Sequence, residues 1–308
     1  MRCIIERRRT NAQSPMNWRS IWTTPVVRSL RPRHCDNAAE GSLTASHFRS
    51  CACCAAPARH GRRGPATGRP LVQRLSRIEV GMHIEILTED SSGQRSLEHL
   101  VPKLIGPHGE VHTWRFHAYR GIGRIPAGLT AKSDPSRRIL LDQLPRLLRG
   151  YAKTPGVDVV LVVLDVDDRD CVSFLAELRS LTESCGAAAL TLFRLVIEEV
   201  EAWYLGDRAA LQRAYPKARL RQLDSYIQDS PCGTWELLAD AVYPGGRGAI
   251  RRAGWPLPGQ IKHEWAERIG PVLDPEHNLS PSFGKLRDGL RRLASPPAPD
   301  SPGVAAPC

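Results

Sequence analysis

The stretch Asp158-Val-Val-Leu-Val-Val-Leu-Asp-Val-Asp-Asp168 decides the fold of this chain. After the first aspartate come six apolar residues with no polar alternation. Such a run is typical of a strand buried on both faces, as in a parallel sheet with helices above and below it. Three acids, Asp165, Asp167 and Asp168, follow at its carboxyl end. In an open α/β sheet, ligands bind at that end of the strands.

Further strand and helix patterns surround this stretch. Apolar or alternating runs predict three more strands, at His83–Glu89, Val111–Tyr119 and Ala189–Ile197. Apolar residues at helical spacing predict helices at Ser96–Ile105, from Asp134 to about Tyr151, at Arg169–Cys185 and from Glu198 to about Tyr215. The residues Ser91 to Gly93 are typical of a turn. The order βαβαβαβα predicts an α/β fold with a doubly wound, mostly parallel sheet over residues 82–205.

The pattern changes after the sheet. Residues 206–295 contain short helical pieces joined by turns rich in proline and glycine, at Thr234–Val242, Gln260–Ile269 and Ser282–Leu293. We expect this part to be a helical appendage packed on the sheet. The last segment, 296–308, is rich in proline and serine and is predicted to be a disordered tail.

The first 81 residues have the composition of a disordered extension. They hold 15 arginines, no lysine and 4 acids, whereas residues 82–308 hold 28 basic and 28 acidic residues. The net charge of +11 therefore comes from the extension and says nothing about the partners of the folded part. Our hypothesis is that Met82 is the natural start and that the extension follows from a misplaced start codon, which the intact mass of natively expressed protein would test. The alternatives are a disordered nucleic-acid-binding arm and an arginine-rich targeting peptide.

Cysteine and hydropathy patterns indicate the compartment. The chain has no apolar run long enough for a membrane span and no secretory signal, so we expect no membrane association. Its cysteines have no disulfide or metal spacing, and the Cys51-x-Cys-Cys54 group near His47 fits no common zinc pattern. A reducing, cytoplasmic setting is expected.

Acidic residues follow three of the predicted strands. Glu89 ends the first, Asp165 and Asp167 follow the third, and Glu198 and Glu201 follow the fourth. Parallel strands end at one edge of a sheet, so these carboxylates are expected to meet there. Hard oxygen ligands suit Mg²⁺ or Mn²⁺, and such ions neutralise charge in phosphoryl transfer.

The acids also have simpler interpretations. Asp165 to Asp168 could form an acidic turn that caps the helix starting near Arg169. Glu198 and Glu201 lie three residues apart and so on one helix face, whereas Glu199 is expected to point elsewhere, to the surface or to a salt bridge.

One segment resembles a known family. The run Phe193-Arg-Leu-Val-Ile-Glu-Glu-Val-Glu-Ala-Trp-Tyr-Leu-Gly-Asp207 is similar to the R-x-x-I-E-x-x-E-A-W-x-L-x-D segment of the domain-of-unknown-function 4276 family, which is Toprim-like and uncharacterised. Glu89 and the D-x-D of Asp165 and Asp167 resemble the Toprim domain of type IA and type II topoisomerases, bacterial primases and overcoming-lysogenization-defect nucleases. The resemblance covers about residues 82–293.

The resemblance implies a Toprim fold and Mg²⁺-dependent phosphodiester chemistry. Glu89 would match the catalytic glutamate, and Asp165 and Asp167 the metal-binding pair. Glu198 and Glu201 match acids of the family segment and would add metal ligands. Relatives of this kind act in defence or genome maintenance and can work beside ATPase partners.

Basic residues complete the predicted site. Arg120 and Arg124, in the glycine loop Arg120-Gly-Ile-Gly-Arg124, are candidate phosphate contacts, although Pro126 makes this loop a poor dinucleotide fingerprint. Arg194 is expected to be buried near the acids, either binding phosphate or forming a salt bridge to one of them. Four residues of the appendage are candidates for a nucleic-acid path across it: Lys262, His263, Lys285 and Arg287.

Other enzyme classes are disfavoured. The chain has no G-x-S-x-G elbow of a serine hydrolase. Arg169 stands where the haloacid-dehalogenase motif requires Thr or Val. Trp203 and Tyr204 are expected to be core residues rather than a base-stacking pair.

Two hypotheses remain. The first is a metal-dependent nuclease or related phosphotransferase. The second is a non-catalytic Toprim-like binding or regulatory module that acts with a partner protein. Acids that converge within about 4–8 Å at an open edge favour the first, and acids neutralised by cations in a closed cluster favour the second.

Overall fold

The computed structural model describes residues 81–129, 134–167, 169–186 and 189–295. The predictions about residues 1–80, about the 296–308 tail and about Asp168 lie outside the described residues. Within the described ranges, no helix is long and apolar enough to cross a membrane.

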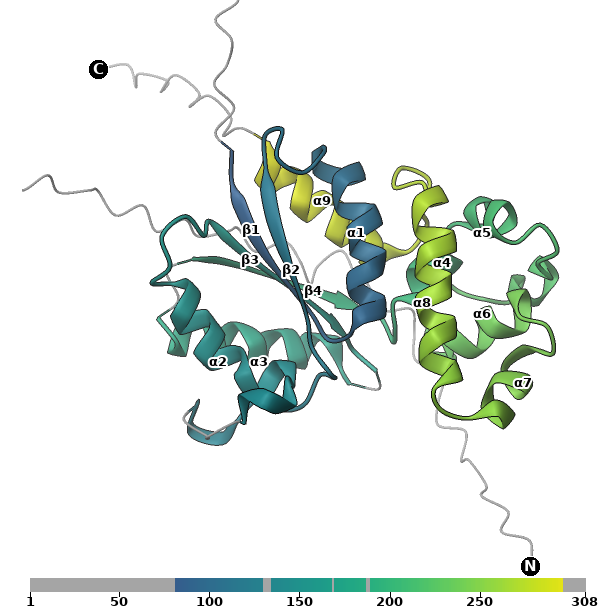
Figure 1. Ribbon diagram of the computed structural model, residues 1–308, viewed down its shortest axis with the longest axis horizontal. Coiled ribbons are helices and arrows are strands. Elements are labelled where there is room, and N and C mark those ends of the chain that lie inside the picture. The colour runs from purple at the N-terminus through teal and green to yellow at the C-terminus, as the bar shows by residue number, and fades with distance from the viewer. Residues whose placement is uncertain (1–80, 130–133, 168, 187–188, 296–308) are drawn as a thin grey trace, which may run out of the picture. The chain divides into compact units, whose positions relative to one another are not determined.

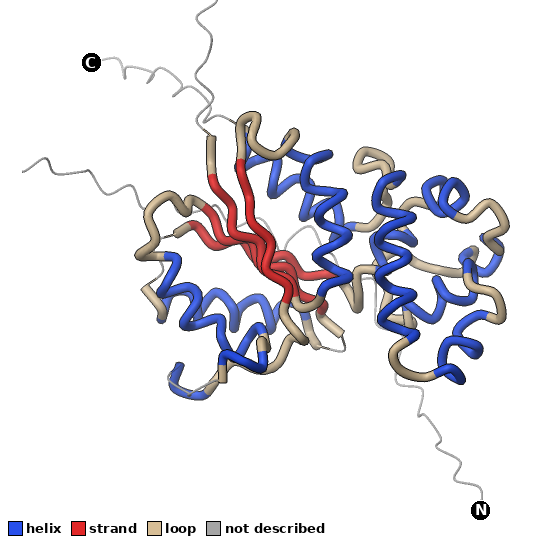
Figure 2. Tube along the Cα trace, viewed as in Figure 1, coloured by secondary structure: helices blue, strands red, loops and turns tan. Residues whose placement is uncertain are grey.

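The described core is a parallel four-stranded sheet. Its strands are β1 (His83–Thr88), β2 (Thr113–Ala118), β3 (Val159–Asp165) and β4 (Leu190–Val196), in the order β2-β1-β3-β4. Figure 2 shows these strands in red with helices on both sides. The α/β class and the parallel sheet predicted from the sequence are confirmed. The finer assignment to a Toprim-like fold stays a prediction.

Helices cover both faces of the sheet (Figure 1). On one face lie α2 (Leu140–Tyr151) and α3 (Cys171–Ser184). On the other lie α1 (Ser91–Ile105) and α9 (Pro281–Ala294). Leu161 of β3 belongs to the apolar cluster on the α1 and α9 side, and its neighbour Val162 is equally buried on the alternate face. This two-sided burial explains why β3 is apolar at every position up to its end.

The strand order reverses between β1 and β3. From β1 the chain passes through α1 to β2 on one side, and it then returns through α2 to β3 on the other side. A crevice forms outside the carboxyl ends of two strands where the order reverses, and ligands of open α/β sheets bind there. The residues that directly follow β1 and β3 therefore lie where the strand order reverses.

Two helix starts differ from the sequence prediction by five residues or more. The turn predicted from Ser91 to Gly93 is wrong, because Asp90 caps a helix that already begins there, with Oδ1 accepting a 2.6 Å hydrogen bond from the Gly93 amide. Asp134 and Pro135 open only a short 3₁₀ turn. Helix α2 begins after it, at Leu140.

The appendage begins with shorter helices than predicted. The continuous helix predicted from Glu198 is wrong: α4 (Glu201–Leu205) ends at Gly206, and α5 (Arg208–Ala214) starts anew. Asp207 causes the break, since its side chain accepts from the Ala210 amide at 2.8 Å and so caps α5.

Among the described residues the appendage has three further α-helices, and the last described helix packs on the sheet instead. They are α6 (Thr234–Val242), α7 (Gly246–Ala253) and α8 (Leu257–Ile269). Helix α8 packs on α1, whereas α9 returns to pack on β4 and α1. Helix α9 therefore completes the layer of helices on this face of the sheet.

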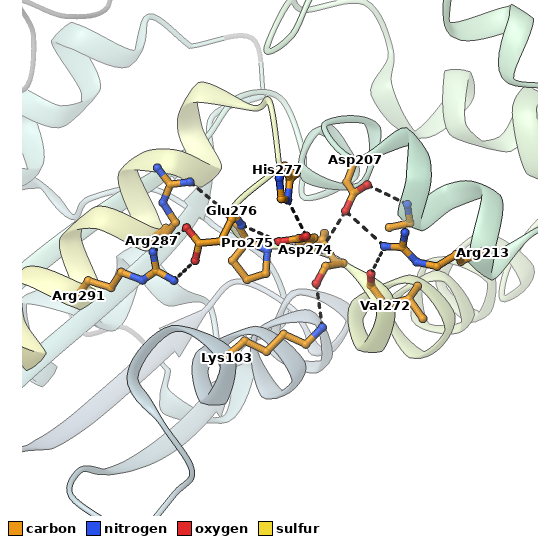
Figure 3. A network of polar contacts seen from close by, with 12 residues as sticks. Lys103, Asp207, Arg213, Val272, Asp274, Pro275, Glu276, His277, Arg287 and Arg291 are labelled. Atoms are coloured by element: carbon orange, nitrogen blue, oxygen red, sulfur yellow. Dashed lines mark hydrogen bonds and ion pairs between the residues drawn. The ribbon is translucent and has the colours of Figure 1, made fainter.

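A polar network fixes the loop before α9 (Figure 3). Asp207 accepts from the Asp274 amide at 2.8 Å, and Arg291 of α9 pairs with Glu276. Lys103 of α1 donates to the Leu273 carbonyl at 2.9 Å. These bonds join α1, α5 and α9 through one loop.

Candidate functional site

Two carboxylates meet where the strand order reverses. Glu89 directly follows β1 and Asp165 ends β3. The Glu89 carboxylate forms a hydrogen bond with the backbone of Asp165. Its other oxygen, Oε2, is shielded from water and has no hydrogen-bond partner among the described residues. The structure thus brings the Glu89 carboxylate to the backbone of Asp165, and one buried oxygen of Glu89 has no partner within the described part of the chain.

The turns after β3 and β4 have an unusual backbone. Asp167 and Glu198 have positive φ values of 52° and 63°, and the Asp167 amide donates to the Glu198 carbonyl at 3.2 Å. Left-handed backbone is uncommon for residues other than glycine and is often found at functional sites. Asp167 itself is exposed, at the rim of the site.

The carboxylates act on one another electrostatically. Burial, followed by the charges of Asp167 and Asp90, raises the pKa of Glu89 to about 7. Burial and the charge of Glu89 raise the pKa of Asp165 well above its ordinary value. Carboxylates this close are stabilised by a cation between them. Perturbed carboxylates in a crevice are also a mark of functional sites.

A second pair of acids, Glu199 and Glu201, lies beside the first. This pair forms ion pairs with a lysine, Lys262. Lys262 of α8 places its Nζ 3.1 Å from Glu199 Oε2 and 3.8 Å from Glu201 Oε2. Burial and the charge of Glu201 raise the pKa of Glu199 to about 7, and burial raises the pKa of Glu201 as well. Burial would lower the pKa of Lys262, but Glu201, Glu199 and Asp165 outweigh it and raise that pKa. Lys262 therefore stays protonated and neutralises part of the acidic charge.

Glu198 has a different place from the one predicted. Its carboxylate accepts hydrogen bonds from the amides of Gly233 (2.7 Å), Thr234 (2.9 Å) and Cys232 (3.3 Å), so it caps the start of α6. The argument from helical spacing does not apply, because α4 begins only at Glu201. The oxygens predicted to bind metal are engaged with backbone amides instead.

Glu199 takes the place beside Glu201. It forms the salt bridge that the sequence analysis allowed for, but with Lys262 and within the site. Lys262 was expected on a path across the appendage. It lies among the acids because α8 packs against α1, a contact that no local pattern reveals.

The three predicted arginines have different surroundings. Arg120 is exposed and Arg124 lines a cavity beside α3. Arg194 is largely buried as predicted, but under α9, where its Nη1 donates to the Phe193 carbonyl at 2.7 Å. Burial and then Arg292 lower the pKa of Arg194 to about 10. The predicted salt bridge from Arg194 to the acids of the site is not among its contacts in the described structure.

The donor set fits a hard divalent cation in its chemistry. Glu89 and Asp165 offer carboxylate oxygens, one of which lacks a partner, and Asp167 lies at the rim. Among the described residues, no group of three or more His, Cys, Asp or Glu side chains is already arranged around a metal position. Mg²⁺ commonly takes one or two carboxylates and keeps water or phosphate oxygens as its other ligands. A pair of these carboxylates, Asp165 with Asp167 or with Glu89, is consistent with that mode.

Two residues of the site escaped the sequence analysis. Asp90 stands beside Glu89, and its charge acts on Glu89, Asp165 and Glu201. Its position next to Glu89 was a usable signal. Tyr204 is a core residue as predicted, and it also hydrogen-bonds to Ser96 beside Glu201, where burial raises its pKa.

Comparisons of the chain with protein-family models, with curated proteins and with solved structures find no match.

Proposed function

We propose that the protein cleaves phosphodiester bonds of nucleic acid with the help of Mg²⁺ or Mn²⁺, at the carboxyl edge of β1 and β3. The observation that carries this proposal is the convergence of Glu89 and Asp165 where the strand order reverses, with Glu89 Oε2 left without a hydrogen bond from any described residue. The resemblance of the acids to a Toprim site supports the same chemistry. An ATPase partner and a role in defence or genome maintenance rest on that resemblance alone.

Each side chain has a task in this proposal. Asp165 and Asp167 would hold the ion, which when bound neutralises phosphate charge and activates water. Glu89 would accept a proton from the attacking water through its unpaired oxygen. Lys262 keeps Glu199 and Glu201 in place beside the reacting centre.

A second candidate function has its own supporting observation. Lys262 already neutralises part of the acidic charge, as in a site that needs no metal ion. A non-catalytic binding or regulatory module would have such a built-in cation.

The test compares substitutions of acidic residues at the two ends of β3. Asp165→Asn/Asp167→Asn removes charges at the carboxyl end of β3. The matched control, Asp158→Asn, removes an acid at its amino end, where the side chain accepts from the His83 amide at 2.8 Å and asparagine can still do so. Each protein is incubated with DNA and RNA substrates and Mg²⁺ or Mn²⁺, and metal binding is titrated by calorimetry.

We expect metal-dependent cleavage in the wild type and in Asp158→Asn, and its loss in the double variant. Removing an ion that stabilises the transition state typically lowers the rate at least about 100-fold. Metal binding without cleavage of any substrate would favour the binding module. If no metal binds to the wild type, the acids are structural and the proposal is wrong.

A further inference from the structure

A cavity of about 450 Å³ opens beside the acidic edge, on the side of α2 and α3. The loop after β2 and the first turns of α3 line it. Two arginines, Arg124 and Arg169, contribute its positive charge, and Glu177 contributes one negative charge. Ile125, Leu141 and Phe174 supply apolar surface. The volume lies within the range of small-molecule sites, and the charged lining suits a polar ligand.

Arg169 is held in position and incompletely satisfied. Its guanidinium lies 4.9 Å from the centre of the Phe174 ring, which fixes its plane. Its Nη1 is shielded from water and has no hydrogen-bond partner among the described residues. A buried donor without a partner is unfavourable, and an anionic oxygen is its strongest acceptor.

Arg124 is placed by a tightly packed loop. Gly123 has a φ of 70°, and a Cβ there would overlap Ile139. The Arg124 amide donates to Asp142 Oδ1 at 3.1 Å, so the backbone is tied to α2 while the Arg124 side chain stays exposed at the cavity. The loop thus fixes where the second positive charge stands.

Both walls of the cavity are joined to the acidic edge. The Gly121 amide donates to the Glu89 carbonyl at 2.9 Å. Arg169 comes two residues after Asp167, and its amide donates to the Val166 carbonyl at 3.0 Å. A nucleic-acid strand with one phosphate at the acids would therefore bring a neighbouring nucleotide to this cavity.

We infer that the cavity binds the phosphate-bearing nucleotide next to the bond that is cleaved, with Arg169 and Arg124 as its phosphate ligands. The inference rests on the proposed function, because it takes the ligand to be the flanking part of the same substrate. Two guanidinium groups suit a phosphate, since each offers several donors in one plane.

Binding of mononucleotides to the full chain tests this, with EDTA present so that no metal contributes. The probes are adenosine 5′-monophosphate and thymidine 5′-monophosphate, and adenosine and thymidine are their phosphate-free counterparts. We expect the monophosphates to bind at least about 10-fold more tightly than the nucleosides, which corresponds to about 1.4 kcal/mol. Arg169→Met and Arg124→Met should each weaken monophosphate binding about 10-fold, and Arg169→Lys should weaken it less.

The matched control is Arg252→Met, which removes an exposed arginine of α7 and should leave binding unchanged. Because Arg169 packs on Phe174, its variant is checked by thermal unfolding. Arg124 has an exposed side chain, so its variant keeps the test decisive if Arg169→Met fails to fold. Equal affinity for monophosphates and nucleosides, or wild-type affinity in Arg124→Met, would overturn the inference.

The outcome is separable from that of the proposed function. Phosphate-dependent binding in a protein that cleaves nothing with Mg²⁺ or Mn²⁺ would leave the cavity as a phosphate site and remove the nuclease. Metal-dependent cleavage without phosphate-dependent binding would support the nuclease and rule out the cavity as a phosphate site.

Discussion

Lys262 brings its own positive charge into the acidic site. Its ammonium faces Glu199 and Glu201, and its charge also acts on Asp165. A protein cation and a divalent ion near the same carboxylates stabilise the same negative charge, so each lowers the benefit of the other.

This competition gives a prediction for Lys262→Met. We expect the variant to be less stable without metal by up to about 3 kcal/mol, because it leaves buried carboxylates without their cation. Mg²⁺ should then restore more stability to the variant than it adds to the wild type. Urea unfolding with and without Mg²⁺ measures both effects, and Lys153→Met, at an exposed position, is the control. Equal stabilisation by Mg²⁺ in both proteins would show that lysine and metal do not share a site.

The candidate site was predictable only where local pattern and topology determine it. Glu89 and Asp165 could be placed together because Glu89 directly follows one strand and Asp165 ends another, and parallel strands end at one edge. Glu198 and Lys262 could not be placed. Glu198 reaches amides of residues 232–234, and Lys262 comes from a helix packed on α1, so both positions depend on contacts between distant parts of the chain.

At the scale of helices and strands, features set by the local apolar pattern were again predicted, and features set by single side-chain contacts were not. The strands were predicted to within about two residues. Burial on both faces makes β3 an uninterrupted apolar run, whereas largely alternating polar and apolar residues indicated the other three strands. The start of α1 was missed because the Asp90 side chain caps a helix where the local composition indicated a turn. The break before α5 was missed because the Asp207 side chain starts a new helix where the pattern indicated an unbroken one. Helix α7 was missed because two of its first three residues are glycines.

The cap on α6 predicts the behaviour of Glu198 variants. Glu198→Ala removes the acceptor of three backbone amides and should lower the free energy of unfolding by about 1–2 kcal/mol. Glu198→Gln keeps one acceptor oxygen, so its free energy of unfolding should fall by less than that of Glu198→Ala. Metal affinity, measured by calorimetry, should stay at the wild-type value in both. A variant of normal stability that no longer binds metal would show that Glu198 is a ligand, as the sequence analysis had it.

The contact between α9 and β4 predicts that alanine substitutions at two glycines of α9 have opposite effects on the stability of the protein. A Cβ at Gly289 would overlap the Arg194 guanidinium, whereas a Cβ at Gly284 meets no atom within 4 Å. Gly289→Ala should therefore destabilise the protein by about 1–3 kcal/mol, and Gly284→Ala should stabilise it by up to about 1 kcal/mol through helix propensity. Thermal unfolding distinguishes them.

The overlap can be tested further by shortening the arginine. Arg194→Ala combined with Gly289→Ala should be more stable than the sum of the two single changes predicts. Simple additivity would mean that Gly289 is required for another reason.

At the scale of the whole molecule, the sheet and the appendage share one core. One apolar cluster of buried residues includes Ile84 of β1 and Leu238 of α6, together with Trp203 and Trp265. The division into an α/β domain and an appendage, predicted from composition, therefore does not require two independently stable units.

A single core predicts a single unfolding transition. Leu238→Ala should lower the free energy of unfolding by about 2–4 kcal/mol and shift the transitions seen by far-ultraviolet circular dichroism and by tryptophan fluorescence together. Leu279→Ala, at a residue that is 70 % exposed, should change little. Transitions that separate in Leu238→Ala would contradict the shared core.

The return of α9 to the sheet also constrains how the protein is made. All four strands leave the ribosome before α9 does, yet α9 covers β4 and packs on α1. Phe283, Leu286 and Leu290, the buried residues that close this face, are among the last of the described chain to be synthesised. The nascent sheet therefore carries an open apolar face until α9 has been synthesised. Chaperones that bind such surfaces have their longest access to this protein during that interval.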